Sequence, residues 1–146
     1  MKRFLSSLLV LCMAMTFLPA SAAAASVSPF GDVQSTDWYY DEVQYVYENG
    51  LMSGTSATTF SPDATTTRGM IVTILHRLEG TPAVSTSGTF ADVAAGQYYT
   101  DAVEWASANG IVGGYGNGRF GPNDPITREQ MAAILSRYAA YKEYDV

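Results

Sequence analysis

The chain has 146 residues, of which 47% are hydrophobic and 15% are charged. This composition is typical of one or two small folded domains rather than of a disordered chain. Its 14 acidic residues outnumber its 8 basic ones, which gives a formal net charge of −6. The acidic balance argues against binding to nucleic acid or to anionic membrane surfaces, because both need a basic face.

The first 25 residues predict a secretory signal peptide. Lys2 and Arg3 precede an uncharged apolar run over residues 4–18, and small residues follow at 20–25, which is the order of a signal sequence. The alternative, an uncleaved membrane anchor, is disfavoured because the run is shorter than the roughly 20 residues of a spanning helix. Cleavage would also remove Cys12, the only cysteine. We therefore expect an exported, acidic protein without disulfides and without membrane insertion after cleavage.

The rest of the chain contains an internal repeat. Residues 30–77 match residues 90–137 without a gap, and about a third of the aligned positions are identical, which identifies a repeated structural unit. The predicted units cover 30–79 and 90–139. A segment rich in Gly, Ser and Thr joins them at 80–89 and is predicted to be a flexible linker, and a tail follows at 140–146. The matched pairs include Phe30 with Phe90, Asp32 with Asp92, Tyr39 with Tyr99, Gly54 with Gly114, Phe60 with Phe120, and Arg68 with Arg128.

Within each unit the sequence predicts a helix, a loop and a second helix. The first helix contains residues 40–48 or their equivalents. Gly50 and Gly110 are expected to end it, because glycine adopts a left-handed backbone without a steric penalty. The segments 51–64 and 111–125 are rich in Gly, Ser, Thr and Pro and predict compact loops. The predicted fold class is therefore mainly all-α, with tandem helix-loop-helix repeats and Gly/Pro-rich loops.

The second helix of each unit is predicted to begin at Thr67 and at Thr127. Thr127 with Gln130 fits a capping box, whereas Met70 at the equivalent position leaves the first cap half made. The spacing i, i+3, i+4, i+7 predicts one apolar stripe on each helix that packs into the core. The stripe residues are Ile71, Ile74, Leu75 and Leu78 in the first unit, and Met131, Ile134, Leu135 and Tyr138 in the second.

The sequence shows no catalytic or metal-binding pattern. His76, the only histidine, falls outside the stripe and is expected at the surface, so a Ser-His-Asp arrangement lacks its base and a zinc site lacks ligands. The glycine-rich run at 113–118 lacks the Lys-Ser/Thr of a phosphate loop. A carboxylate-dependent envelope hydrolase is the least favoured alternative, because the recurring acids stand once per unit. We therefore expect no enzyme, no cofactor and no metal.

One set of polar and aromatic residues recurs in a pattern that suggests binding. An arginine in the first turn of a helix opposes the helix dipole, which prefers acids there. Beside free backbone amides, it would form a positive pocket for a carboxylate or phosphate, while aromatic side chains offer flat faces for sugar rings. Pairing of each arginine with an acid for stability is an equally good interpretation. The candidate ligand-binding residues are Arg128, Arg68, Asp92, Asp32, Trp38 and Tyr98.

Several motifs recur in order in both units: Phe-x-Asp-Val at 30–33 and 90–93, Asn-Gly-Leu/Ile at 49–51 and 109–111, Phe-x-Pro at 60–62 and 120–122, and Thr-Arg at 67–68 and 127–128. With Trp-Tyr-Tyr-Asp at 38–41, they resemble the S-layer homology (SLH) domain family over nearly the whole chain after residue 25. The resemblance implies helical units that associate in threes, as a pseudo-threefold cluster. It also implies that grooves between units bind secondary cell-wall polysaccharide, typically pyruvylated, and anchor a secreted protein at the cell wall or S-layer surface.

The resemblance further implies that Arg68 and Arg128 meet the anionic sugar, with the aspartates and aromatics as supporting contacts. The family's Thr-Arg-Ala-Glu signature is Thr-Arg-Gly-Met at 67–70 and Thr-Arg-Glu-Gln at 127–130, so Arg128 is expected to contribute more. Only two units are present, so a third belongs to a longer chain, or self-association supplies it, or the pair stands alone with one groove. The alternative function is a structural or self-assembly module that binds no glycan.

Overall fold

The computed structural model describes residues 28–85 and 87–145, and within them every regular element is a helix. The predicted mainly α-helical fold class is therefore confirmed. The signal peptide predicted over residues 1–25 lies outside the described residues. The four helices are α1 (Tyr40–Glu48), α2 (Arg68–Leu78), α3 (Thr100–Ala108) and α4 (Arg128–Tyr141).

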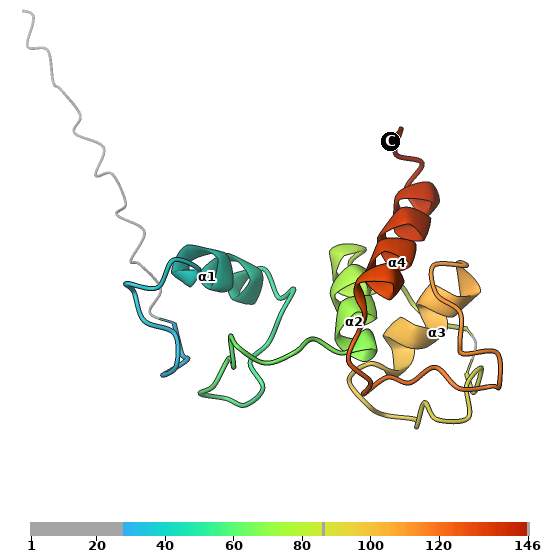
Figure 1. The fold of residues 1–146 in the computed structure, drawn as a ribbon, viewed down its shortest axis with the longest axis horizontal. Coiled ribbons are helices and arrows are strands. Elements are labelled where there is room, and N and C mark those ends of the chain that lie inside the picture. The colour runs from blue at the N-terminus through green and yellow to red at the C-terminus, as the bar shows by residue number, and fades with distance from the viewer. Residues whose placement is uncertain (1–27, 86, 146) are drawn as a thin grey trace, which may run out of the picture.

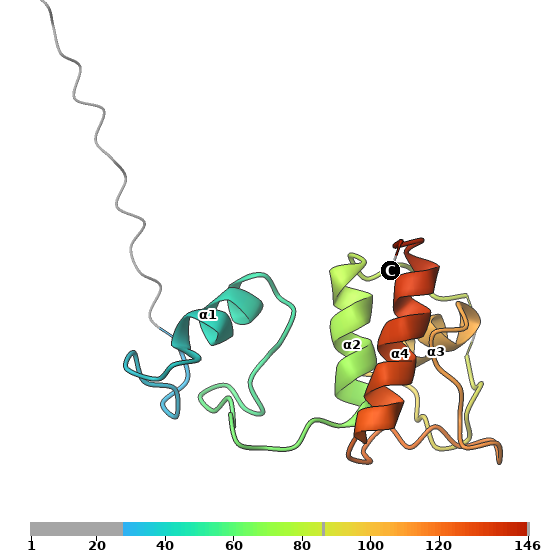
Figure 2. The ribbon, with the colours of Figure 1, turned by 45° about the horizontal axis from the view of Figure 1, so that its top comes forward.

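The described chain forms two lobes and a pair of helices. We call residues 28–66, which contain α1, the first lobe, and residues 89–126, which contain α3, the second lobe. Figure 1 shows the first lobe on one side, whereas α2, α3 and α4 cluster together on the other. In Figures 1 and 2, α2 and α4 lie side by side. Their C-terminal ends are joined through Glu79, which accepts a hydrogen bond from Tyr138 and pairs with Lys142 Nζ at 3.0 Å.

The helix starts follow from local sequence. The Thr67 hydroxyl accepts a hydrogen bond from the Met70 amide, whereas Thr127 and Gln130 complete a capping box. Each such cap stabilises a helix start by about 1 kcal/mol. The left-handed glycines after α1 and α3 are also present, with φ of 67° at Gly50 and 69° at Gly110. These predictions are confirmed.

The second helix of the first unit packs against the lobe of the second unit. Val72 and Leu75 of α2 belong to the same buried cluster as Val103 and Trp105 of α3. The cluster also holds Phe120, which is completely buried in the loop after α3. The main core of the protein therefore lies at the junction between the two units.

The first turn of α2 is held by the backbone of the second lobe. The Arg68 amide donates to the Asp124 carbonyl at 3.0 Å, and the Gly69 amide donates to the Pro122 carbonyl at 2.8 Å. These amides would otherwise lack partners at a helix start. A Cβ added to Gly69 would lie 2.8 Å from the Pro122 oxygen, so the close approach depends on glycine at this position.

The predicted apolar stripe is partly wrong. Leu78 is 51% exposed and Leu135 is 49% exposed, although Leu75 and Ile134 are buried as expected. The buried side of α2 instead begins at its first-turn arginine, because the helix turns that side toward the second lobe. Periodicity could not select this side, since α2 carries apolar residues almost all round. The buried residues of α2 are Arg68, Gly69, Val72, Thr73, Leu75 and His76.

The prediction that His76 lies at the surface is also wrong. Its side chain is 7% exposed, and its ring centroid lies 5.3 Å from that of Trp105. His76 Nε2 is 2.9 Å from the Pro82 carbonyl oxygen. The imidazole therefore packs between α3 and the segment that follows α2.

The two lobes share one fold but differ in burial. In both, the amide after the first phenylalanine donates to the loop, from Gly31 to Thr58 and from Ala91 to Gly118, each at 2.9 Å. The equivalent aromatics nevertheless differ: Trp105 is 4% exposed and Tyr45 is 63% exposed. The reason is that α2 covers the second lobe. The buried cluster of the first lobe consists of Phe30, Val33 and Val43.

This asymmetry predicts unequal costs for two equivalent substitutions. Phe120→Ala should lower the free energy of unfolding by roughly 3–5 kcal/mol, as expected for a fully buried phenylalanine. Phe60→Ala should cost clearly less, because Phe60 is only half-buried. Denaturant unfolding of the two purified variants measures both losses. Equal losses would contradict the different burial of the lobes.

Candidate functional site

A pocket lies where the two units meet. Its volume is about 270 Å³. The loop at residues 112–115 forms one part of the lining, α4 forms another over residues 129–137, and Arg68 reaches the pocket from α2. The lining side chains from α4 are Glu129, Gln130, Ala133, Ile134 and Arg137.

The Arg68 side chain is fixed by the second lobe. Its Nε donates to the Phe120 carbonyl at 2.9 Å, and its Nη2 donates to the Gly113 carbonyl at 3.2 Å. The guanidinium carbon lies 4.8 Å from the ring centroid of Tyr115 and 4.6 Å from that of Phe120. A guanidinium has five N–H donors, so the two hydrogen bonds leave donor capacity for a ligand.

Arg68 is a buried cation that forms no ion pair with an acid among the described residues. Its exposure is 5%, and the ion pairs found in the described part of the chain join Arg119 with Asp92 and Lys142 with Glu79. Burying a charge is costly unless it is paired or hydrogen-bonded. Carbonyl oxygens and aromatic faces offset part of that cost. Arg137 adds a second positive charge to the pocket lining and Glu129 adds one negative charge, so the lining stays positive by one charge. The pocket therefore suits an anion.

Asp32 and Asp92 each close the loop of their own lobe. Asp32 accepts hydrogen bonds from the amides of Phe60 and Ser61 at 2.8 and 2.7 Å. Asp92 accepts them from the amides of Phe120 and Gly121 at 2.8 and 2.9 Å. Neither aspartate lines the pocket. Asp92 thus holds the loop of the second lobe, which forms one wall of this pocket, and Asp32 holds the equivalent loop of the first lobe, which lines a different pocket.

The hydrogen bonds to these aspartates lower the pKa of both carboxyl groups. At Asp32 the bond from the Phe60 amide is the largest cause, and burial opposes it. At Asp92 burial is the largest single influence and raises the pKa, but the bonds from the Phe120, Gly121 and Asp92 amides and the charge of Arg119 together outweigh it, so the pKa is lowered. The ionised form of both aspartate side chains is therefore stabilised in the folded state.

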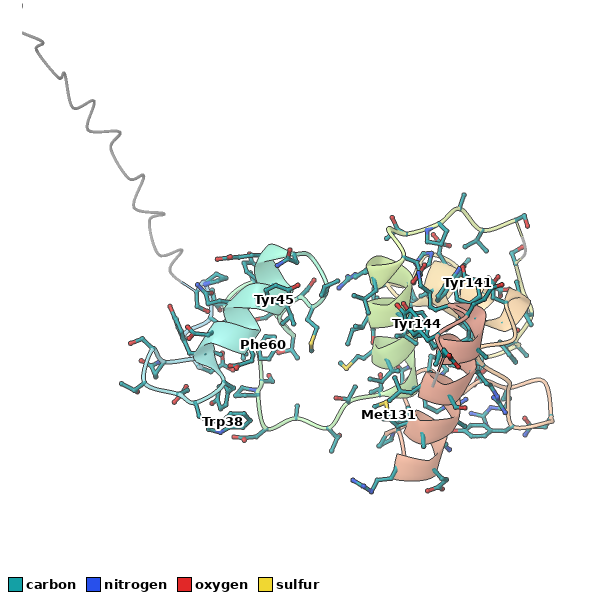
Figure 3. The ribbon with its side chains drawn as sticks, turned by 90° about the horizontal axis from the view of Figure 1, so that it is seen from above. Trp38, Tyr45, Phe60, Met131, Tyr141 and Tyr144 are labelled. Carbon is teal, nitrogen blue, oxygen red and sulfur yellow. The ribbon has the colours of Figure 1, made fainter. Side chains whose placement is uncertain are left out.

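The other candidate residues lie outside the pocket. Trp38 is 87% exposed, and Figure 3 shows it on the first lobe, away from α4. Tyr98 is 55% exposed and lines a second pocket, of about 490 Å³, between the first lobe and α2. Arg128 is exposed in the first turn of α4 and does not line the 270 Å³ pocket. The structure thus brings Arg68 alone of the six into that pocket.

Sequence reasoning missed Arg137 and Tyr115, which line the pocket with Arg68. Arg137 could have been found, because Arg77 recurs there at the repeat spacing. Tyr115 gave no such signal, since Thr55 is its equivalent in the first unit.

The described residues show no basis for a metal or for a membrane span. No group of three His, Cys, Asp or Glu side chains among them could hold a metal ion. None of the helices in this part of the chain is long and apolar enough to cross a membrane.

Comparison with known proteins identifies the family. The S-layer homology domain model matches residues 29–69 and 89–132, one segment in each unit. The chain belongs to the S-layer homology domain family. The family relationship covers both Thr-Arg helix starts and both Phe-x-Asp-Val motifs.

Relatives include surface proteins and enzymes. The chain is 38% identical over 151 residues to an endoglucanase of Bacillus sp. (strain KSM-635), covering 99% of the chain and 16% of that protein. It is 38% identical over 115 residues to the surface-layer 125 kDa protein of Lysinibacillus sphaericus, covering 74% of the chain and 10% of that protein. It is 33% identical over 123 residues to the S-layer protein sap of Bacillus anthracis, covering 84% of the chain and 15% of that protein. The chain thus spans less than a fifth of each relative.

The SLH domain is a non-catalytic anchoring domain, and the enzyme-named relative aligns over its SLH part. The chain is accordingly a cell-wall anchoring module, found outside the cell at the cell wall or S-layer surface. The resemblance inferred from the motifs is confirmed.

The two lowered aspartate pKa values predict how stability depends on pH. A carboxyl whose folded pKa lies below its unfolded pKa, about 3.9 for aspartate, stabilises the fold above that pH and loses this effect as pH falls through the folded pKa. The melting temperature should therefore drop as pH falls from about 5 toward 2. Asp92→Asn should melt lower at neutral pH and show a shallower drop, as measured by thermal unfolding across the range. Parallel pH profiles for the variant and the parent protein would contradict this role for Asp92.

Proposed function

We propose that the chain anchors its host protein by binding an anionic secondary cell-wall polysaccharide, in the pocket lined by Arg68 and Arg137. The observation that carries the proposal is the buried Arg68 guanidinium, which has no carboxylate partner among the described residues and lines a pocket open to a ligand. A carboxylate on the glycan would complete its hydrogen bonding in a bidentate arrangement.

A pyruvate ketal is the substituent that this pocket favours. Such a ketal places one carboxylate on a sugar ring, which matches one cationic site beside apolar and aromatic surface. Tyr115 and Ile134 supply that surface within the pocket. Gln130 and Glu129 line the same pocket. The Gln130 amide can donate to and accept from sugar hydroxyls, and the Glu129 carboxylate can accept from them.

The proposal gives the six candidate residues different roles. Arg68 becomes the main ligand-binding residue, while Asp92 and Asp32 position the loops through their bonds to backbone amides. Trp38 and Tyr98 are exposed and offer stacking surfaces along an extended glycan rather than in the pocket. Arg128 lies outside the pocket, so its contribution to glycan binding is expected to be the smaller one.

The alternative function is a structural or self-assembly module with no glycan binding. The two hydrogen bonds from Arg68 to carbonyls of the second lobe favour it, because they explain the arginine by stability alone. Arg68 variants cannot separate the two functions, since both predict a loss. Arg137 can, because it lines the same pocket but is exposed at the surface of α4.

Arg137→Gln should weaken binding to purified, pyruvylated cell-wall polysaccharide by roughly 10–100-fold, the equivalent of one charge-assisted hydrogen bond. Isothermal titration calorimetry measures the affinity, and melting temperature checks the fold. Arg128→Gln is the matched control, since it removes an exposed arginine of the same helix outside the pocket and should leave the affinity nearly unchanged.

Three outcomes separate the explanations. Loss of affinity in Arg137→Gln and loss of binding to glycan from which the ketal has been removed support the proposal. No heat of binding with the parent protein at any glycan concentration would overturn it in favour of the structural alternative. Equal affinity of Arg137→Gln and the parent protein would also contradict the assigned pocket.

A further inference from the structure

The side of α4 that corresponds to the docked side of α2 has no partner in the described structure. In α2 that side is buried against the second lobe. Adding the repeat offset gives six equivalent positions of α4; five of them are exposed, and the sixth, Ala133, is half-buried and lines the 270 Å³ pocket. The exposed residues are Arg128, Glu129, Ala132, Leu135 and Ser136, which stand where α2 has Arg68, Gly69, Val72, Leu75 and His76.

The first lobe has an uncovered surface at the matching place. The second pocket, of about 490 Å³, is the repeat equivalent of the 270 Å³ pocket. It is larger, and it includes loop residues whose equivalents in the second lobe contact the start of α2. These loop residues are Phe60, Pro62, Ala64 and Thr66.

That surface also carries backbone carbonyl groups equivalent to those that accept hydrogen bonds from Arg68. In the second lobe, the carbonyls of Phe120 and Gly113 accept from Arg68. Their equivalents are Phe60 and Ser53, and both line the larger pocket. Tyr45 adds apolar surface, since it is 63% exposed where the equivalent Trp105 is buried. Figure 3 shows Tyr45 and Phe60 together on the first lobe.

We propose that this uncovered surface of the first lobe binds the start of α4 from a second copy of the chain. Arg128 would then donate to the Phe60 and Ser53 carbonyls as Arg68 does to Phe120 and Gly113, and Leu135 would pack beside Tyr45. Each copy carries both the exposed helix side and the surface that fits it. Two copies that exchange these contacts form a closed dimer with twofold symmetry, which leaves neither contact unused.

Two differences make this contact weaker than the intramolecular one. Gly69 lies against the Pro122 carbonyl, where a Cβ would approach to 2.8 Å, and α4 has Glu129 at the equivalent position. The helix start must therefore stand farther from Pro62. Thr55 also replaces Tyr115, so one of the two rings that flank the Arg68 guanidinium is missing. The dimer should accordingly dissociate on dilution.

The inference does not depend on glycan binding, and light scattering with analytical ultracentrifugation over a concentration series tests it. The purified protein should pass from monomer to dimer as concentration rises. Arg128→Ala with Leu135→Asp should raise the dissociation constant by roughly 30-fold or more, the size expected for loss of anchor residues. Leu78→Asp, which changes another exposed leucine, on α2, is the matched control and should dimerise as the parent protein does.

A mixing experiment distinguishes the proposed contact, between α4 of one copy and the first lobe of the other, from a contact between identical surfaces of the two copies. Tyr45→Asp changes the first lobe at an exposed position and should also block dimerisation. Mixed with the Arg128→Ala/Leu135→Asp protein, it should form a heterodimer through the one intact contact. A protein that stays monomeric at every concentration would overturn the proposal and point to a helix from a further SLH unit as the occupant. A dimer that survives both sets of changes would overturn it as well.

Discussion

The burial of Arg68 in the second lobe is the interaction on which the rest of the structure depends. Its guanidinium lies against two aromatic rings and donates to two carbonyls, while the amides of the same helical turn donate to two more. Val72 and Leu75 continue the contact into the main core. Because the arginine belongs to the first unit and its partners to the second, one side chain joins the two repeats.

The two lobes show what that helix contributes. The second lobe, covered by α2, buries Phe120 and Trp105 almost completely, whereas Phe60 and Tyr45 in the first lobe are partly or largely exposed. The same comparison explains the pockets: the one with the arginine in place is smaller, and the one without it is larger. A repeat protein stabilises each unit through its neighbour, and here the first lobe lacks the neighbour that the second has.

Features set by neighbouring residues were predictable from the sequence, and features set by docking between units were not. The caps at Thr67 and Thr127 and the turns at Gly50 and Gly110 follow from local backbone chemistry. The buried position of His76 depends on which side of α2 meets the second lobe, and an apolar helix does not encode that choice. For the same reason, the sequence identified Arg68 as a candidate but could not assign it to a pocket.

Native-state hydrogen exchange tests the central claim most directly, because it reports the opening free energy of each helix separately. It should be measured at low protein concentration, where the proposed dimer is expected to dissociate. We predict that amides of α3, under α2, exchange only through openings of markedly higher free energy than the equivalent amides of α1. Equal protection of α1 and α3 would contradict the claim that docking of the Arg68 helix start stabilises the second lobe over the first.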